Sequence, residues 1–210
     1  MVTLTTLSPS LTAAPCGAAG DRAATALSNQ ARREHPRRCS SCPDIVRHVV
    51  HVHHPFLREQ LTYLDALLAE IGRQTGSEDV HWKRASGLFV KLRTELEQCM
   101  LHEEKSVFPQ IERWERQRYQ AGTREPPADL IQSIHALERW HAGLFHGLWL
   151  MLRRARDASE APGRGAMWRD FVTELSAVCD DFDQHLFEED CLLLPQITGW
   201  QVGHIGKRAR

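Results

Sequence analysis

The sequence predicts an all-α fold, an up-down-up-down four-helix bundle, and three observations support this. From about residue 44 to residue 194, apolar residues recur at alternating intervals of three and four, the spacing of one buried helix face. No segment alternates polar and apolar residues with the period of two that indicates a half-buried strand. The long periodic segments are separated by short connections rich in glycine and proline, which favours antiparallel neighbours.

The periodic pattern predicts helices over residues 44–73, 78–119, 129–157 and 166–194. Ser77 and Asp129 are candidate N-caps, because their side-chain oxygens can accept hydrogen bonds from the first N–H groups of a helix. Proline lacks an N–H group and clashes with the preceding turn of a helix. We therefore expect the second helix to break near Pro109 and the fourth to stop at Pro195.

Composition divides the chain into three parts. Residues 1–43 are rich in Ala, Ser, Thr, Pro and Arg without sustained periodicity, so we expect a flexible arm. Residues 44–198 form the predicted bundle, and residues 199–210 form a C-terminal tail. The 27 acidic and 26 basic residues nearly balance, which gives no indication of a nucleic-acid partner. No apolar run reaches the roughly 18–20 residues of a membrane span, and no secretion signal is recognisable, so we expect no membrane partner and a cytoplasmic location.

The six cysteines of a helical, cytoplasmic chain are expected to be thiols rather than disulfides. Cys39 and Cys42 form a C-x-x-C pair in the predicted arm. This pair is open to three interpretations: a redox pair, half of a metal site, or a chance arrangement.

Polar residues interrupt the apolar stripes at one level of the predicted bundle. They are His54 on the first helix, Cys99 and Glu103 on the second, His141 on the third, and His185 and Glu189 on the fourth. Because neighbouring helices run in opposite directions, antiparallel packing brings all six to the same layer. Burying three imidazoles and two carboxylates together costs many kcal/mol, a cost that a bound cation would offset.

The spacing and chemistry of these residues also favour a metal. His185 and Glu189 are four residues apart, so they face one way from their helix and can bind one centre. Mixed imidazole and carboxylate ligands suit iron, manganese or zinc, and bundle interiors commonly hold di-iron sites. A single histidine in an apolar stripe is usually a hydrogen-bonded core residue, but five such groups at one level favour metal binding over that interpretation.

The two halves of the chain repeat each other with a period of about 86 residues, one helical hairpin per half. The segment from Cys99 to Ile111 matches the segment from His185 to Ile197, including a shared Pro-Gln-Ile ending. The repeat therefore places Cys99 where the second half has a histidine.

Residues 44–198 resemble the hemerythrin (HHE cation-binding) family, which has a histidine on the first helix and then His-x-x-x-Glu-Glu before an apolar-Phe-Pro, duplicated. Within this stretch, His53-His54-Pro-Phe-Leu-Arg-Glu-Gln-Leu61 resembles the Repair of Iron Centers branch, the iron–sulfur cluster repair di-iron proteins. The resemblance implies an iron centre, with two ions favoured and one left open. It implies histidine ligands and bridging carboxylates at His54, His141, His185, Glu103 and Glu189. It also implies that His81 lies near the metal without binding it, or lines a channel to it.

The sequence departs from that branch at two places. Cys99 replaces the fourth histidine. It could ligate iron as a thiolate, pack as a neutral thiol beside an open or asymmetric site, or oxidise. The sequence slightly favours the neutral thiol. The branch's N-terminal domain is absent or replaced by the arm with Cys39 and Cys42. Phe145 follows His141 where oxygen-carrying hemerythrins have a second histidine, which weakens the oxygen-carrier interpretation. His53 is a candidate to support the site without binding the metal.

The resemblance implies a non-haem iron protein that acts on or binds nitric oxide, dioxygen or peroxide in nitrosative or oxidative stress, with iron–sulfur cluster repair as one role. An oxygen or iron sensor without turnover is the alternative. A bundle that has lost its site is a third interpretation, supported by Cys99 alone. The sequence identifies neither a catalytic residue nor a protein partner.

Overall fold

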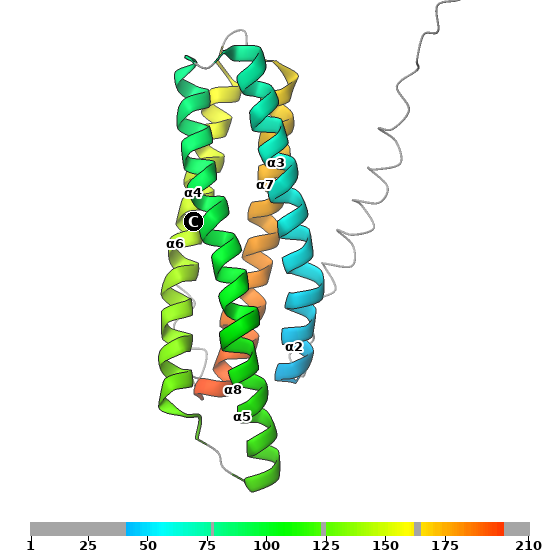
Figure 1. Ribbon diagram of the computed structural model, residues 1–210, viewed down its shortest axis with the longest axis vertical. Helices are drawn as coiled ribbons and strands as arrows, with labels where there is room; N and C mark the ends of the chain where they lie inside the picture. Colours follow the sequence, from blue (N-terminus) through cyan, green and yellow to red (C-terminus); the bar gives the residue numbers. More distant parts are fainter. Residues whose placement is uncertain (1–40, 77, 123–124, 162–164, 200–210) are drawn as a thin grey trace, which may run out of the picture. The chain divides into compact units, whose positions relative to one another are not determined.

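The computed structural model describes residues 41–76, 78–122, 125–161 and 165–199. Residues 1–40, including Cys39, and residues 200–210 lie outside this range. The described residues form an all-α bundle in which α3 packs on α4, α4 on α6, α6 on α7, and α7 back on α3 (Figure 1). This arrangement confirms the predicted fold class. None of the helices formed by the described residues is long and apolar enough to cross a lipid bilayer.

Each helix of the bundle is named here by its segments. The first helix consists of α2 (Cys42–His48), the π-helical turn η1 (Val49–His53) and α3 (His54–Thr75). The second consists of α4 (Val80–His102), η2 (Glu103–Val107) and α5 (Phe108–Ala121). The third is the uninterrupted α6 (Ala128–Ser159). The fourth consists of α7 (Ala166–Leu186), η3 (Phe187–Leu193) and α8 (Leu194–Thr198).

The predicted breaks at Pro109 and Pro195 are wrong, because both helices continue through these prolines. Pro55, Pro109 and Pro195 are each the second residue after a π-helical turn. In a π-helical turn the hydrogen bonds run from residue i to residue i+5 rather than i+4. The carbonyl four residues before each proline therefore accepts a hydrogen bond from the residue that follows the proline. The missing N–H of proline then leaves no backbone carbonyl without a donor.

The core of the bundle follows the predicted stripes closely. Leu57, Leu96, Leu144 and Phe171, one from each of the four helices, are all buried. On α4 Phe89 is buried, whereas its neighbour Leu88 is only half-buried. Packing accounts for this difference, because the Phe89 ring contacts the Phe171 ring edge-to-face with centroids 6.4 Å apart.

Close packing at the turn between α3 and α4 supports a stability prediction. A Cβ atom added at Gly72 would lie 2.5 Å from Cε2 of Trp82. The indole cannot easily move, because its Nε1 donates a 2.7 Å hydrogen bond to the carbonyl of Leu68. Gly72→Ala is expected to lower the free energy of unfolding by about 1–2 kcal/mol, because overpacking outweighs the better helix propensity of alanine.

Urea denaturation of the purified chain measures this change. Gly87→Ala is the matched control, because Gly87 is exposed on α4 and an added Cβ meets nothing within 4 Å. That control should gain up to about 1 kcal/mol from helix propensity alone. Equal changes in the two variants would contradict the packing argument.

Candidate metal centre

The bundle brings together all six residues predicted at one level. His54 begins α3, Cys99 lies on α4, Glu103 begins η2, His141 lies on α6, His185 lies on α7, and Glu189 lies on η3. None of these six residues exposes more than 2% of its surface. Antiparallel packing of the amphipathic helices is therefore sufficient to gather them, as the periodicity indicates.

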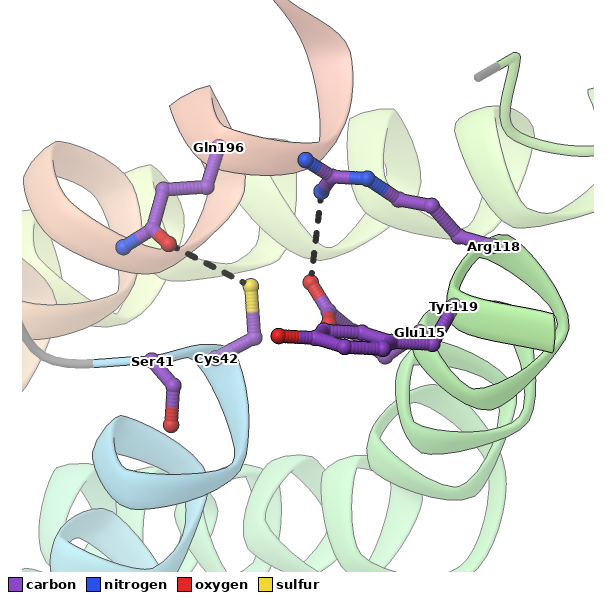
Figure 2. A pocket seen from close by; sticks show the side chains of 6 residues that line it. All are labelled: Ser41, Cys42, Glu115, Arg118, Tyr119 and Gln196. Carbon is purple, nitrogen blue, oxygen red and sulfur yellow. Dashed lines mark hydrogen bonds and ion pairs between the residues drawn. The ribbon is translucent and has the colours of Figure 1, made fainter. Parts of the chain in front are cut away.

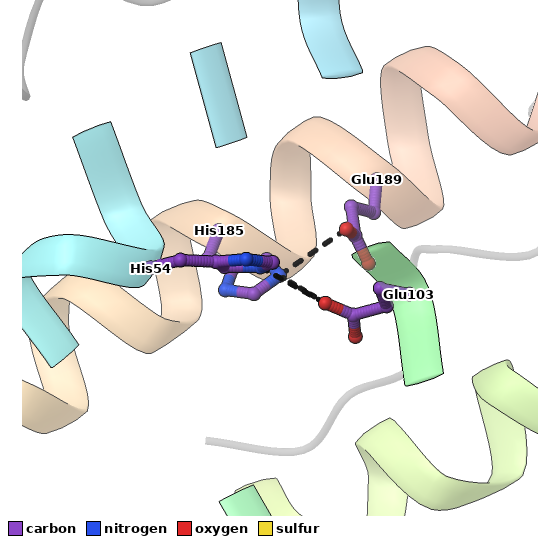
Figure 3. Close-up of side chains that lie close together, drawn as sticks. All are labelled: His54, Glu103, His185 and Glu189. Carbon is purple, nitrogen blue, oxygen red and sulfur yellow. Dashed lines mark ion pairs between the residues drawn. The ribbon is translucent and has the colours of Figure 1, made fainter. Parts of the chain in front are cut away.

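In each of the two carboxylates at this level, one oxygen faces one side of the cluster and the other oxygen faces the other side. Oε2 of Glu103 lies 2.9 Å from Nε2 of His54 and 3.8 Å from Nε2 of His185 (Figure 3). Oε1 of the same carboxylate lies 3.0 Å from Nε2 of His141 and 3.2 Å from Sγ of Cys99. Glu189 repeats the pattern, with Oε1 3.3 Å from Nε2 of His185 and Oε2 3.3 Å from Nε2 of His141. Carboxylates placed in this way have the geometry to bridge two metal ions.

Several buried polar atoms of the cluster have no hydrogen-bond partner. They are Nε2 of His54, Oε2 of Glu103, both ring nitrogens of His185 and both carboxylate oxygens of Glu189. An unsatisfied buried polar group costs about 1–3 kcal/mol, and a charged one costs more. These six atoms belong to four side chains, each of which offers one ligand atom within 4.8 Å of the others, so one cation can bind all four side chains together. The donor set therefore fits a metal ion.

Two acidic residues outside this layer orient two of its histidines. Nδ1 of His54 lies 2.7 Å from Oε1 of Glu104, and Nδ1 of His141 lies 3.2 Å from Oδ1 of Asp190. A carboxylate that accepts the Nδ1 proton fixes the ring tautomer and leaves Nε2 free to bind a metal. Each supporting acid directly follows a carboxylate of the cluster, Glu104 after Glu103 and Asp190 after Glu189. Sequence reasoning missed this role, although the repeated acidic pair was its signal.

The electrostatics of the cluster couple its acids and bases. Burial by itself would raise the pKa of Glu103, but the imidazoles of His141 and His54 outweigh burial and hold that pKa well below its usual range. Burial by itself would lower the pKa of His54, but the carboxylates of Glu103 and Glu104 raise it above its usual range. A metal ion that binds here must displace any proton on the ligating imidazole nitrogens, because imidazole binds a metal only in its neutral form.

Cys99 lies on the same side of the cluster as His141. Its Sγ approaches Glu103, and the three residues form a group whose potential ligand atoms lie within 4.8 Å of one another. Burial raises the pKa of the Cys99 thiol to about 12, so the thiol is protonated at neutral pH in the metal-free chain. A coordinating metal ion deprotonates such a thiol outright.

The expectation that His81 lies near the metal is wrong. His81 is exposed in the first turn of α4, whereas Cys99 is 18 residues further along. At 1.5 Å per residue, this separation corresponds to about 27 Å along the helix. The expectation rested on the short motif Asp79-Val80-His81. Because α4 is long, this motif lies towards the opposite end of the bundle from the metal centre.

Cys42 is buried at the start of a helix, whereas the sequence predicts it to lie in a flexible arm. It is the first residue of α2, where it is buried and lines a pocket with Ser41, Glu115, Arg118, Tyr119 and Gln196 (Figure 2). Its Sγ lies 3.6 Å from Oε1 of Gln196. Burial and the neighbouring Glu115 raise the pKa of its thiol to about 12, which disfavours rapid thiol exchange. Cys39 lies outside the described residues, so a redox role for the pair stays a prediction.

Comparison with known proteins agrees with the geometry of the centre. A search of curated proteins finds no match to this chain. The family profile described as the hemerythrin HHE cation binding domain matches residues 46–197, which include all six residues of the cluster. Because this match covers most of the chain, the protein belongs to the hemerythrin HHE cation-binding family.

Proposed function

We propose that this protein is a non-haem iron protein whose bundle binds two ions bridged by Glu103 and Glu189. The division of each carboxylate between two sides of the cluster is the observation that carries this proposal. His54 and His185 would hold the first ion, and His141 would hold the second. Bound ferrous iron would supply an open coordination position at which a small molecule can bind and change oxidation state.

Cys99 completes the second metal position as a thiolate in this proposal. The sequence slightly favoured a neutral thiol beside an open position. The short separation between Sγ and Glu103, together with the shared side of His141, favours ligation instead. Cys99 is equivalent in the repeat to His185, which would bind the first ion. The second ion would therefore have a softer ligand than the first.

The burial of the centre limits the size of what it can bind. Its ligands are almost completely buried, which suits nitric oxide, dioxygen or peroxide rather than a larger substrate. A role in nitrosative or oxidative stress, including iron–sulfur cluster repair, rests on the resemblance of the His53–Leu61 segment to that branch. Cys42, Cys99 and Cys179 are free thiols, which supports a reducing compartment such as the cytoplasm.

A sensor without turnover is the alternative, and the π-helical turns favour it. Glu103 and Glu189 both lie in such turns, which are less regular than the α-helix around them. Loss of metal would leave both oxygens of the buried Glu189 carboxylate without a hydrogen-bond partner, so metal occupancy would change the local order of η3. A partner could recognise that change without any reaction at the metal.

Metal content of the anaerobically purified chain, with an optical spectrum, tests the proposal. About two irons per chain would support the bridged centre, whereas about one would restrict binding to one side and favour the sensor. A folded chain that takes up no metal on reconstitution would overturn both interpretations. Repeated consumption of nitric oxide or peroxide by the iron-loaded chain would then support an enzyme, and stoichiometric binding alone would support a sensor.

A further inference from the structure

A second group of imidazoles and carboxylates lies beside the metal centre and shares none of its six residues. Oε2 of Glu188 lies 2.7 Å from Nδ1 of His48, and Oε1 of Glu188 lies 3.4 Å from Nε2 of His53. Oδ2 of Asp181 lies 3.2 Å from Nδ1 of His53. His53 and Glu188 are completely buried, and the side chain of His48 is 19% exposed. The group therefore reaches from the interior to the surface.

The π-helical turn η1 brings the two histidines of this group together. His48 and His53 are five residues apart, and on an ideal α-helix such residues point about 140° apart. The turn between them has the wider i to i+5 pattern, so residues five apart lie above one another. Their ring centroids are 5.3 Å apart. Glu188 reaches them from η3, so two irregular turns build the group.

The distances in this group match those between ligands of one metal ion. Metal–nitrogen and metal–oxygen bonds of about 2.1 Å place neighbouring ligand atoms about 3.0–3.4 Å apart. The separations of 2.7 Å and 3.4 Å need only a small adjustment to reach this range. His53 is also supported through Nδ1 by a carboxylate, as His54 and His141 are, which leaves its Nε2 directed at Glu188.

The chemistry of the group also favours a cation. His48, His53 and Glu188 each offer one potential ligand atom, and these atoms lie within 4.8 Å of one another. Two imidazoles and one carboxylate are a common ligand set for divalent first-row metals, with positions left open for water. The partial exposure of His48 provides a route by which an ion and its water ligands can enter.

We propose that His48, His53 and Glu188 form a second, separate site for a divalent transition-metal ion, with Asp181 orienting His53. This site does not depend on the bridged centre, because none of its ligands takes part there. The rings of His53 and His185 stack at 5.8 Å between centroids, so the site directly adjoins the centre. An ion held there is accessible from the surface, unlike an ion in the bridged centre.

Zinc stoichiometry of the metal-free, full-length chain tests this site, measured by equilibrium dialysis with elemental analysis. His48→Ala and Glu188→Gln should each bind one Zn²⁺ ion more weakly than the wild type, by more than about tenfold. His51→Ala is the matched control, because His51 lies exposed on the same π-helical turn and should leave zinc binding unchanged. Any zinc bound by Cys39 and Cys42 is common to all variants and cancels.

A second comparison separates this site from the bridged centre. Glu189→Ala should retain one Zn²⁺ ion that the double variant His48→Ala/Glu189→Ala lacks, whether or not the bridged centre binds metal. Circular dichroism should show unchanged helix content in His48→Ala, because that side chain is partly exposed. Equal zinc binding by wild type and His48→Ala, or an equal loss in His51→Ala, would overturn the proposed site.

Discussion

Glu189→Ala is expected to abolish the stabilisation that iron in the bridged centre gives to the bundle. In the wild-type chain, an ion present at 100 times its dissociation constant should raise the free energy of unfolding by about 2.7 kcal/mol. Glu189 presents one oxygen to His185 and the other to His141, so its loss removes a ligand from both metal positions. Thermal unfolding with and without iron measures the difference.

The metal-free form of this variant provides an internal reference. Both carboxylate oxygens of Glu189 are buried without hydrogen-bond partners, so the alanine variant loses an unfavourable group as well as packing volume. The metal-free melting temperature should therefore change less than the metal-dependent increment. Glu112→Ala, which removes an exposed carboxylate from α5, should retain the full increment. If Glu189→Ala kept the full iron-dependent increment of the wild-type chain, the assignment of Glu189 as a ligand would be wrong.

Cys99→Ala should remove the thiolate signature of the centre and weaken its second metal position. We expect the cobalt-loaded wild-type chain to show a thiolate-to-metal charge-transfer band, because Sγ lies within the ligand group of Glu103 and His141. Alanine offers no ligand, so one Co²⁺ ion should bind more weakly by at least about tenfold. Optical titration of the metal-free chain with Co²⁺ measures both effects.

Two further variants make the Cys99 result specific. Cys99→His should lose the charge-transfer band but keep both ions, because it restores the residue found at the repeat position. Cys179→Ala should keep the band, although Cys179 is equally buried and its thiol pKa is also raised to about 12 by burial. A band that persists in Cys99→Ala would place the thiolate elsewhere in the chain.

The fold and the layer of site residues were predictable because both follow from helical periodicity. Polar residues at His54, His141 and His185 stand out against apolar stripes, and antiparallel packing fixes their common level. The supporting acids Glu104 and Asp190 were not predicted, because a carboxylate beside a candidate ligand is usually solvated. Their role becomes visible only when the distance to Nδ1 of a facing histidine is known.

The π-helical turns could not be predicted from periodicity for a physical reason. A single extra residue in a turn shifts the phase of the helix beyond it, whereas the apolar pattern is averaged over several turns. This shift explains the wrong breaks at Pro109 and Pro195, since proline was judged by the rules of an ideal α-helix. It also explains why His48 and His53 gave no sign of proximity.

The same turns affect how this chain should be compared with its relatives. Beyond η1, η2 and η3, the outer segments α2, α5 and α8 are rotated relative to a continuous α-helix. An alignment that assumes uninterrupted heptads will slip by one position there and pair buried residues with exposed ones. Insertions and deletions of one residue at these places are therefore informative characters. They would separate lineages that keep the bridging glutamates but present different surfaces at the far end of the bundle.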